Sequence, residues 1–128
     1  MLGPFAHLLR HPPHPYPGMS ITVSWYGRQD VLWAQIDTGA DVTFIPDWLV
    51  GHLRLRPLND WVELVNPRAQ KENFPLYSAD LTFLGLTFRA QPVVPMDWDE
   101  VLIGLDILNA WVLTLDGPNR RFSIQETT

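Results

Sequence analysis

The sequence predicts an all-β fold in one domain, and three observations support this class. Apolar and polar residues alternate over short segments, which is the period of a half-buried strand. Turn signals separate these segments at intervals of about 8–12 residues, as they do in β-sandwiches and β-barrels. The chain has 128 residues, 46% hydrophobic and 18% charged, so it can bury one core but is too short for two lobes.

Residues 1–18 are expected to form an extended arm or linker before the folded domain of residues 19–128. Residues 10–18 contain four prolines, which disfavour both a helix and a central strand. His7, His11 and His14 lie in or beside this segment. A zinc site needs ligands held in a rigid frame, so solvated linker histidines are the favoured interpretation, and no metal is expected.

The first half of the domain contains three apolar strand segments and one helical turn. Ile21, Val23 and Trp25 alternate with polar residues in the first strand, and residues 26–30 turn the chain into a second strand, residues 31–36. A third apolar run covers residues 42–45. Residues 47–51 suggest a single helical turn, with Asp47 as its N-cap and Gly51 at its end.

The second half predicts three hairpins and a short helix. Residues 61–65 pair with residues 74–83 across residues 66–73, and Leu84-Gly85 forms a tight turn into residues 86–90, where Leu86, Phe88 and Ala90 share one face. An acidic loop over residues 95–100 precedes an apolar strand, residues 101–103, and a helix, residues 105–110. A closing hairpin follows, with strands at residues 111–115 and 120–125.

Composition limits the classes of partner. The formal charge is −5 and the sequence has no basic cluster beyond Arg120-Arg121, which argues against nucleic acid. No apolar run reaches the length of a membrane span, so no membrane partner is expected. The absence of cysteine excludes disulfides and thiolate chemistry and suits a reducing cytoplasm, the expected compartment.

One segment indicates a specific chemistry. The residues Asp37-Thr38-Gly39-Ala40-Asp41 lie between two apolar runs, so they set a carboxylate on a tight turn between buried strands. Gly39 would let a ligand or a second backbone come close. The alternative interpretation of this motif is an acidic turn that caps a strand.

This turn resembles the active-site loop of pepsin-like aspartic proteases. Residues 101–109 resemble the apolar-apolar-Gly motif and short helix near the C-terminus of retroviral-type proteases. The order and separation of the two motifs are similar to those of one retropepsin lobe, over about residues 20–124. The resemblance implies a single pepsin-like (retropepsin) β-barrel lobe with one or two short helices, forming a homodimer. It also implies an aspartic-type endopeptidase that acts on protein or peptide substrates without cofactor or metal.

The resemblance assigns roles residue by residue. Asp37 would be catalytic, and Thr38 would hydrogen-bond across the dimer. Gly104, beneath the loop with Leu102 and Ile103, would join Thr38 and Gly39 in supporting it. Asp106 is expected to be a cap or structural partner rather than a second acid. The residues expected to contact substrate are Gly39, Ala40, Asp41, Val65 and Asn66.

The chemistry itself requires two chains if the motif is active. Peptide hydrolysis of this kind uses one ionised and one protonated carboxyl group around a single water. The chain has one such motif, so a two-fold axis would bring Asp37 to its own copy. The closing hairpin is a candidate for further dimer interface.

Two departures from the viral pattern stand out. Viral members of the family commonly have Arg at the position of Leu105. In this respect the chain resembles cellular and bacterial members more than viral ones. The candidate flap, residues 65–74, has no glycine and carries Arg68, Lys71 and Glu72, so an ordinary exposed hairpin is the alternative. The rival function is a catalytically weak or inactive dimer of the same fold that serves as a peptide-binding module. A weaker third is an adaptor or metal-binding domain that uses the His-Pro arm.

Overall fold

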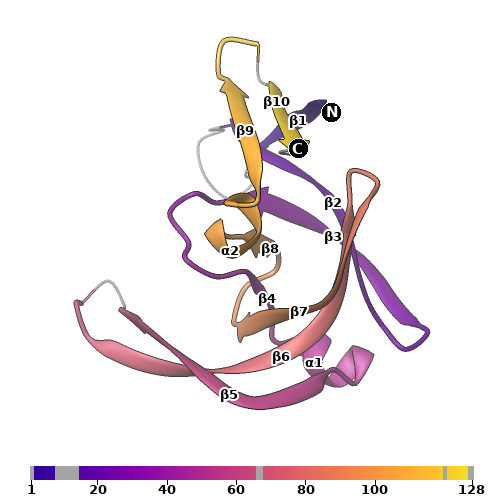
Figure 1. Cartoon of the computed structure of the whole chain (residues 1–128), viewed down its shortest axis with the longest axis vertical. Coiled ribbons are helices and arrows are strands. Elements are labelled where there is room, and N and C mark those ends of the chain that lie inside the picture. Colours follow the sequence, from indigo (N-terminus) through magenta and orange to yellow (C-terminus); the bar gives the residue numbers. More distant parts are fainter. Residues whose placement is uncertain (1, 8–14, 66–67, 120, 127–128) are drawn as a thin grey trace.

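Ten strands and two short helices make up the described structure, a computed structural model that covers residues 2–7, 15–65, 68–119 and 121–126 (Figure 1). The chain is mostly β, with 65% strand and 9% helix, so the all-β prediction is confirmed. No helix in these ranges is long and apolar enough to cross a membrane. In chain order the elements are β1 (Leu2–His7), β2 (Pro15–Trp25), β3 (Arg28–Ile36), β4 (Phe44–Pro46), α1 (Trp48–Leu53), β5 (Arg56–Val65), β6 (Lys71–Phe83), β7 (Leu86–Met96), β8 (Val101–Ile103), α2 (Leu105–Leu108), β9 (Trp111–Asp116) and β10 (Arg121–Glu126).

Six of these strands close into a barrel. The order runs β6-β7-β4-β8-β3-β2, and β6 then pairs with β2 as well as with β7. The inward faces of these strands supply most of the core, whose largest fully buried side chains include Ile21, Ile45, Leu81, Phe83 and Ile103. Because β3 and β8 are parallel, with Ile36 opposite Ile103, the segments that follow the two strands leave the barrel at the same place.

Residues 2–7 and 15–18 lie in strands of the sheet, so regular structure is present before residue 19, where the folded domain was expected to begin. Strand β1 pairs with β2 and with β10, and β2 itself begins at Pro15. Pro15 and Pro17 are two residues apart, so their nitrogens face the same edge of β2, and pairing with β3 starts only at Gly18. Extended proline-containing chain can therefore continue the strand.

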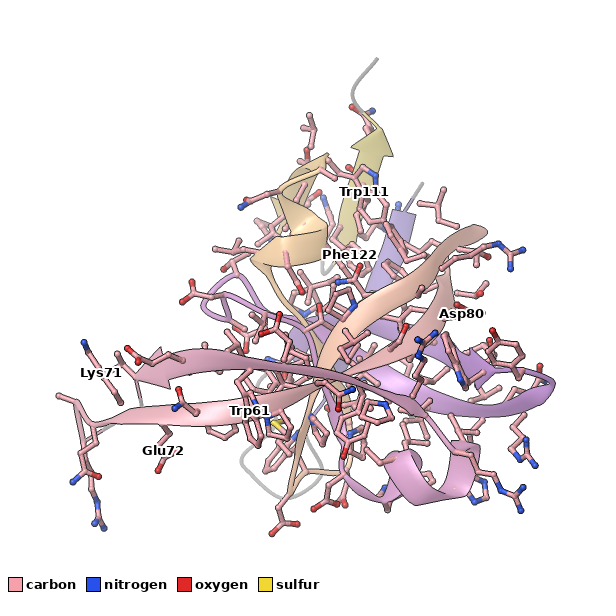
Figure 2. The ribbon with its side chains drawn as sticks, turned by 60° about the horizontal axis from the view of Figure 1, so that its bottom comes forward. Trp61, Lys71, Glu72, Asp80, Trp111 and Phe122 are labelled. Carbon is pink, nitrogen blue, oxygen red and sulfur yellow. The ribbon has the colours of Figure 1, made fainter. Side chains whose placement is uncertain are left out.

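The hairpin of β5 and β6 projects from the barrel as a long curved ribbon (Figure 1). Pairing continues to Val65 opposite Lys71, so its turn is shorter than the expected residues 66–73. Figure 2 shows Trp61, Lys71 and Glu72 on this ribbon, and Lys71 lies 3.6 Å from Glu63 across it. In Figure 1 the end of the ribbon lies on the same side of the molecule as the segment between β3 and β4.

Two further hairpins, the one that turns at Leu84-Gly85 and the closing hairpin, lie where the sequence predicted them. Leu84 and Gly85 both have positive φ, 50° and 76°, and connect Phe83 directly to Leu86, as expected for a tight hairpin. The closing hairpin pairs residues 111–116 with residues 121–126, close to the predicted strands at 111–115 and 120–125; residue 120 lies outside the described residues. Trp111 at its base packs against Phe83 and Phe88 at ring-centroid distances of 5.8 and 4.9 Å.

Two local predictions were wrong. Ala90 has φ 51° at a bulge where β6 and β7 change register, so it is exposed and does not continue the face of Phe88. Helix α1 does start after Asp47, but no side-chain bond caps it. It also runs past Gly51 to Leu53 and ends at Arg54, a left-handed residue with φ 53°.

Candidate functional site

The loop that links β3 to β4 begins at Asp37, at the mouth formed by the ends of β3 and β8. The Asp37 N–H donates to the Ile103 carbonyl at 3.0 Å, which fixes the start of the loop to β8. The Ala40 N–H donates to the Asp37 carbonyl at 3.2 Å and closes a tight turn. Asp37 is half-buried, whereas Thr38 and Gly39 are exposed at the tip of the turn.

The Asp37 carboxylate is oriented by main chain. Its Oδ1 accepts the Gly39 N–H at 2.9 Å, an arrangement typical of Asx turns. No described residue donates to Oδ2. A Cβ placed on Gly39 would lie 3.3 Å from Oδ1 and would meet nothing else, so the space above this glycine is open. The turn therefore presents a fixed carboxylate beside an uncovered backbone.

The second half of the loop rests directly on Gly104. The Leu105 N–H donates to the Ala40 carbonyl at 2.8 Å. A Cβ on Gly104 would collide with the Val42 carbonyl and lie 2.9 Å from the Ala40 oxygen, both of which are backbone atoms. Gly104 has φ −96° and ψ −176°, an ordinary extended conformation, so contact rather than backbone angle requires glycine here.

Asp106 ties the end of the loop to α2 and β7. Its Oδ1 accepts the Thr43 hydroxyl at 2.7 Å and the Ile107 N–H at 2.9 Å. Its Oδ2 accepts the Thr43 N–H at 3.1 Å and the Gln91 amide at 3.2 Å. The Thr43 hydroxyl in turn accepts the Gly104 N–H at 3.2 Å. The prediction that Asp106 is a structural partner is confirmed.

The structure brings together four of the residues singled out from the sequence: Asp37, Thr38, Gly39 and Gly104. Of the residues expected to contact substrate, Asp41 is exposed on the loop and Val65 is exposed on the hairpin. Ala40 is buried, and both its N–H and its carbonyl are used within the fold. Asn66 lies outside the described residues. The substrate role of these residues stays a prediction.

Two residues of this region, Thr43 and Gln91, were not predicted from the sequence. Thr43 stands within an apolar run and is fully buried, 0% exposed, which is unusual for a hydroxyl residue without a partner. If the apolar run is taken as a strand with Thr43 facing the core, its hydroxyl is expected to have a hydrogen-bond partner. Gln91 follows the bulge at Ala90, whose shift of register the sequence did not reveal.

Outside the loop, His52 lies 3.3 Å from Asp30. The described residues contain no group of three His, Cys, Asp or Glu side chains that could hold a metal. His11 and His14 lie outside the described residues. In the turn of the closing hairpin, hydrogen bonds from the Asn119 side chain and then from its backbone lower the pKa of Asp116.

A surface hollow of about 490 Å³ lies at the turn between β2 and β3, away from the Asp37 loop. It is lined by Trp25, Tyr26, Gly27, Asp80, Arg89 and Ala90. None of the residues predicted to act in catalysis or substrate binding borders it.

The loop can therefore supply one oriented carboxylate, next to exposed backbone, on a rigid barrel. Such a group can accept a proton from water or share a proton with a second carboxyl group. Comparisons of the chain with protein-family models, with curated proteins and with solved structures found no match.

Proposed function

We propose that this chain is one subunit of a homodimeric, retropepsin-like aspartic endopeptidase. The observation that carries the proposal is the Asp37 carboxylate, held by the Gly39 N–H at 2.9 Å in a turn whose tip is exposed. A general base must have a fixed orientation and must be within reach of its substrate. The hydrogen bonds that join this turn to Ile103 and Leu105 support the first requirement, and the open space above Gly39 supports the second.

The second carboxyl group of the mechanism comes from a second copy of the chain. Asp106 lies nearby but is not free, because both of its oxygens already accept hydrogen bonds. A two-fold axis beside the turn pairs Asp37 with the partner's Asp37 and satisfies the chemistry with one motif per chain. The exposed Thr38 then lies at the contact between the two turns.

The edge of the sheet also favours a second copy. Strand β9 is the last strand of the sheet order, so one edge has no described neighbour. Its Val112 and Leu115 side chains are exposed, and the strand contains neither proline nor lysine. Apolar edges without such protection tend to pair with another chain.

Catalysis uses one water held between the two carboxyl groups. The ionised carboxylate takes a proton from the water as the oxygen attacks the scissile carbonyl carbon, and the protonated partner donates to the carbonyl oxygen. The C–N bond then breaks as the leaving nitrogen accepts a proton from the carboxyl group that took it from water. The other carboxylate recovers a proton from a hydroxyl of the tetrahedral intermediate, which becomes the new carboxyl group of the product. Two carboxyl groups this close share a single proton because both cannot ionise together. Neither metal nor cofactor enters these steps.

The projecting hairpin of β5 and β6 supports an extended polypeptide as substrate. A strand laid between the hairpin and the Asp37 turn can bond through its main chain in the manner of an added β-strand. Trp61 and Val65 are 62% and 66% exposed on this hairpin, which favours substrates with hydrophobic side chains.

A second candidate is a dimer of the same fold that binds extended peptides without useful turnover. Two features favour it: Leu105 stands where viral enzymes have a cationic residue, and the segment from Val65 to Phe74 contains no glycine that would ease closure over substrate. The intact motif from Asp37 to Gly39 favours the enzyme.

Incubation with casein separates the two candidates. Wild type and Asp37→Asn are compared between about pH 4 and pH 7, where a pair of carboxyl groups that shares one proton should give a maximum of activity. The peptidase predicts cleavage by wild type that pepstatin blocks, that chelators leave unchanged and that Asp37→Asn lacks. Equal cleavage by both proteins, or cleavage lost only to chelators, would reject the assignment.

A further inference from the structure

We infer that Asp106 is a positioning residue that holds the loop from Asp37 to Thr43 in the position that catalysis requires. The inference deepens the proposed function and rests on it for its catalytic meaning. Its structural part, that the Asp106 carboxylate sets the position of the loop, can be tested separately.

Four groups on three separate segments converge on the Asp106 carboxylate, and all four are donors. The N–H and the hydroxyl of Thr43 come from the end of the loop, at 3.1 and 2.7 Å. The Gln91 side chain reaches in from β7 at 3.2 Å, and the Ile107 N–H comes from α2 at 2.9 Å. One side chain thus joins the loop, the helix and the barrel wall.

The site requires a carboxylate rather than an amide. The Thr43 hydroxyl already accepts the Gly104 N–H at 3.2 Å, so it directs its own proton to Asp106. Each carboxylate oxygen then accepts from two donors. An asparagine would turn its NH₂ group toward one of these pairs and leave donors facing donors. The change is nearly isosteric, so it tests the hydrogen bonding and not the packing.

The loop has few other attachments. Its start is bonded to Ile103 and its middle to Leu105. Beyond Asp106, the end of the loop is held by the Val94 N–H, which donates to the Thr43 carbonyl at 3.0 Å, and by the Gly104 N–H, which donates to the Thr43 hydroxyl at 3.2 Å. Gly104 lies beneath the loop with no room for a Cβ, so the loop and α2 are in direct backbone contact. Release of Thr43 from Asp106 therefore lets the loop lift from Gly104, and Asp37 moves with it.

Thr43 is fully buried, whereas Asp106 is exposed. A substitution at Asp106 can admit water and need not leave a buried cavity. The folded state should therefore survive the change while the geometry of the loop does not. Such a shift of the loop should lower kcat and leave KM nearly unchanged, because substrate can still bind.

The test compares Asp106→Asn with a matched control, Asp30→Asn. Asp30 accepts the Val31 N–H at 2.9 Å near the β2–β3 turn, so the control makes the same chemical change at the opposite end of β3 from the loop. With casein-derived peptide as substrate, Asp106→Asn should lower kcat by about ten- to a hundredfold while KM changes little, the size expected for a displaced catalytic group. Asp30→Asn should retain the wild-type kcat.

A second readout does not depend on activity. In amide spectra, Asp106→Asn should speed hydrogen exchange at Thr43 and Gly104 and shift the Gly39 resonance, which reports on the Asp37 carboxylate. The control Asp30→Asn should change none of these. If wild type shows no Asp37-dependent cleavage, the proposed function fails, and this readout alone decides whether Asp106 positions the loop.

A folded Asp106→Asn variant with wild-type kcat, or with an unchanged Gly39 resonance, would overturn the inference. If Asp106→Asn does not fold, Gln91→Met replaces it, because this change removes one donor and keeps the side-chain length. It should shift the Gly39 resonance in the same sense by a smaller amount. An unchanged Gly39 resonance in folded Gln91→Met would then count against the inference.

Discussion

Gly104→Ala should destabilise the protein more than a glycine-to-alanine substitution at an exposed position does. The new Cβ would overlap the Val42 carbonyl and approach the Ala40 oxygen to 2.9 Å, and neither backbone atom can rotate away. The loop must lift, which stretches the bond from the Leu105 N–H to Ala40, 2.8 Å, and the bond from the Gly104 N–H to Thr43, 3.2 Å.

The magnitude follows from these contacts. Overpacking at a site that cannot relax costs about 1–3 kcal/mol. Each weakened hydrogen bond adds about 0.5–1.5 kcal/mol, so the two together with the overpacking give a loss of about 2–6 kcal/mol. This is a large share of the roughly 5–15 kcal/mol by which small domains are stable. The backbone angles of Gly104 suit alanine, so strain in φ contributes nothing to the loss.

Urea unfolding measures the effect, with Gly51→Ala as the matched control and all proteins at one concentration, because dimers unfold in a concentration-dependent way. Gly51 lies in α1, and a Cβ there would meet nothing within 4 Å, so alanine should be neutral or stabilise the helix by up to about 1 kcal/mol. A Gly104→Ala protein within about 0.5 kcal/mol of wild type would refute the packing argument.

Three further predictions follow from the loop and the closing hairpin. Asp37→Asn should abolish cleavage yet leave cooperative thermal unfolding in place, because the change is nearly isosteric; a folded variant that still cuts would contradict its role. Thr38→Val should weaken the dimer by about 0.5–1.5 kcal/mol per lost hydrogen bond, and an unchanged dimer constant in sedimentation would argue against an inter-chain contact there. Because bonds from Asn119 lower the pKa of Asp116 below its ordinary 3.8, the turn should keep their contribution above that pH and lose it as pH falls through the lowered pKa. The Asn119 amide resonance should show this acid step in wild type and not in Asp116→Asn.

Local patterns predicted much of the fold. Alternation of apolar residues identified the core strands. The turns predicted at residues 26–30 and at Leu84-Gly85 are present, the first confined to Tyr26-Gly27, and these four turn residues all have positive φ. These features depend on residues close together in the chain, so a single sequence contains the information needed to find them.

Pairing between strands that are far apart in the sequence could not be predicted from local patterns. Strand β1 is held by pairing such as Leu2 with Ser123, which no local pattern specifies. The bulge at Ala90 and the left-handed residue Arg54 at the end of α1 both place non-glycine residues at positive φ, where the sequence gives no signal. Tertiary contacts decide these conformations.

The candidate site likewise has some features that could be predicted from the sequence and others that could not. The turn at Asp37 was recognisable because its residues are contiguous, and Gly104 because it belongs to a second short motif. The bonds that join Thr43 and Gln91 to Asp106 connect residues 63 and 15 positions apart. Only the barrel, by setting the middle of β7 and the start of α2 beside the residue that precedes β4, makes those partners neighbours.

Mixing wild type with Asp37→Asn tests the central claim, that two chains share one catalytic centre. Wild type is held at a fixed concentration at which it is dimeric, the variant is added and allowed to exchange, and the rate of peptide cleavage is followed. If subunits exchange at random, activity should fall to about half at an equimolar ratio, because half of the wild-type chains then pair with an inactive partner. A rate that stays constant as the variant is added, with exchange shown by differently labelled chains, would mean that each chain acts alone and would contradict the shared centre.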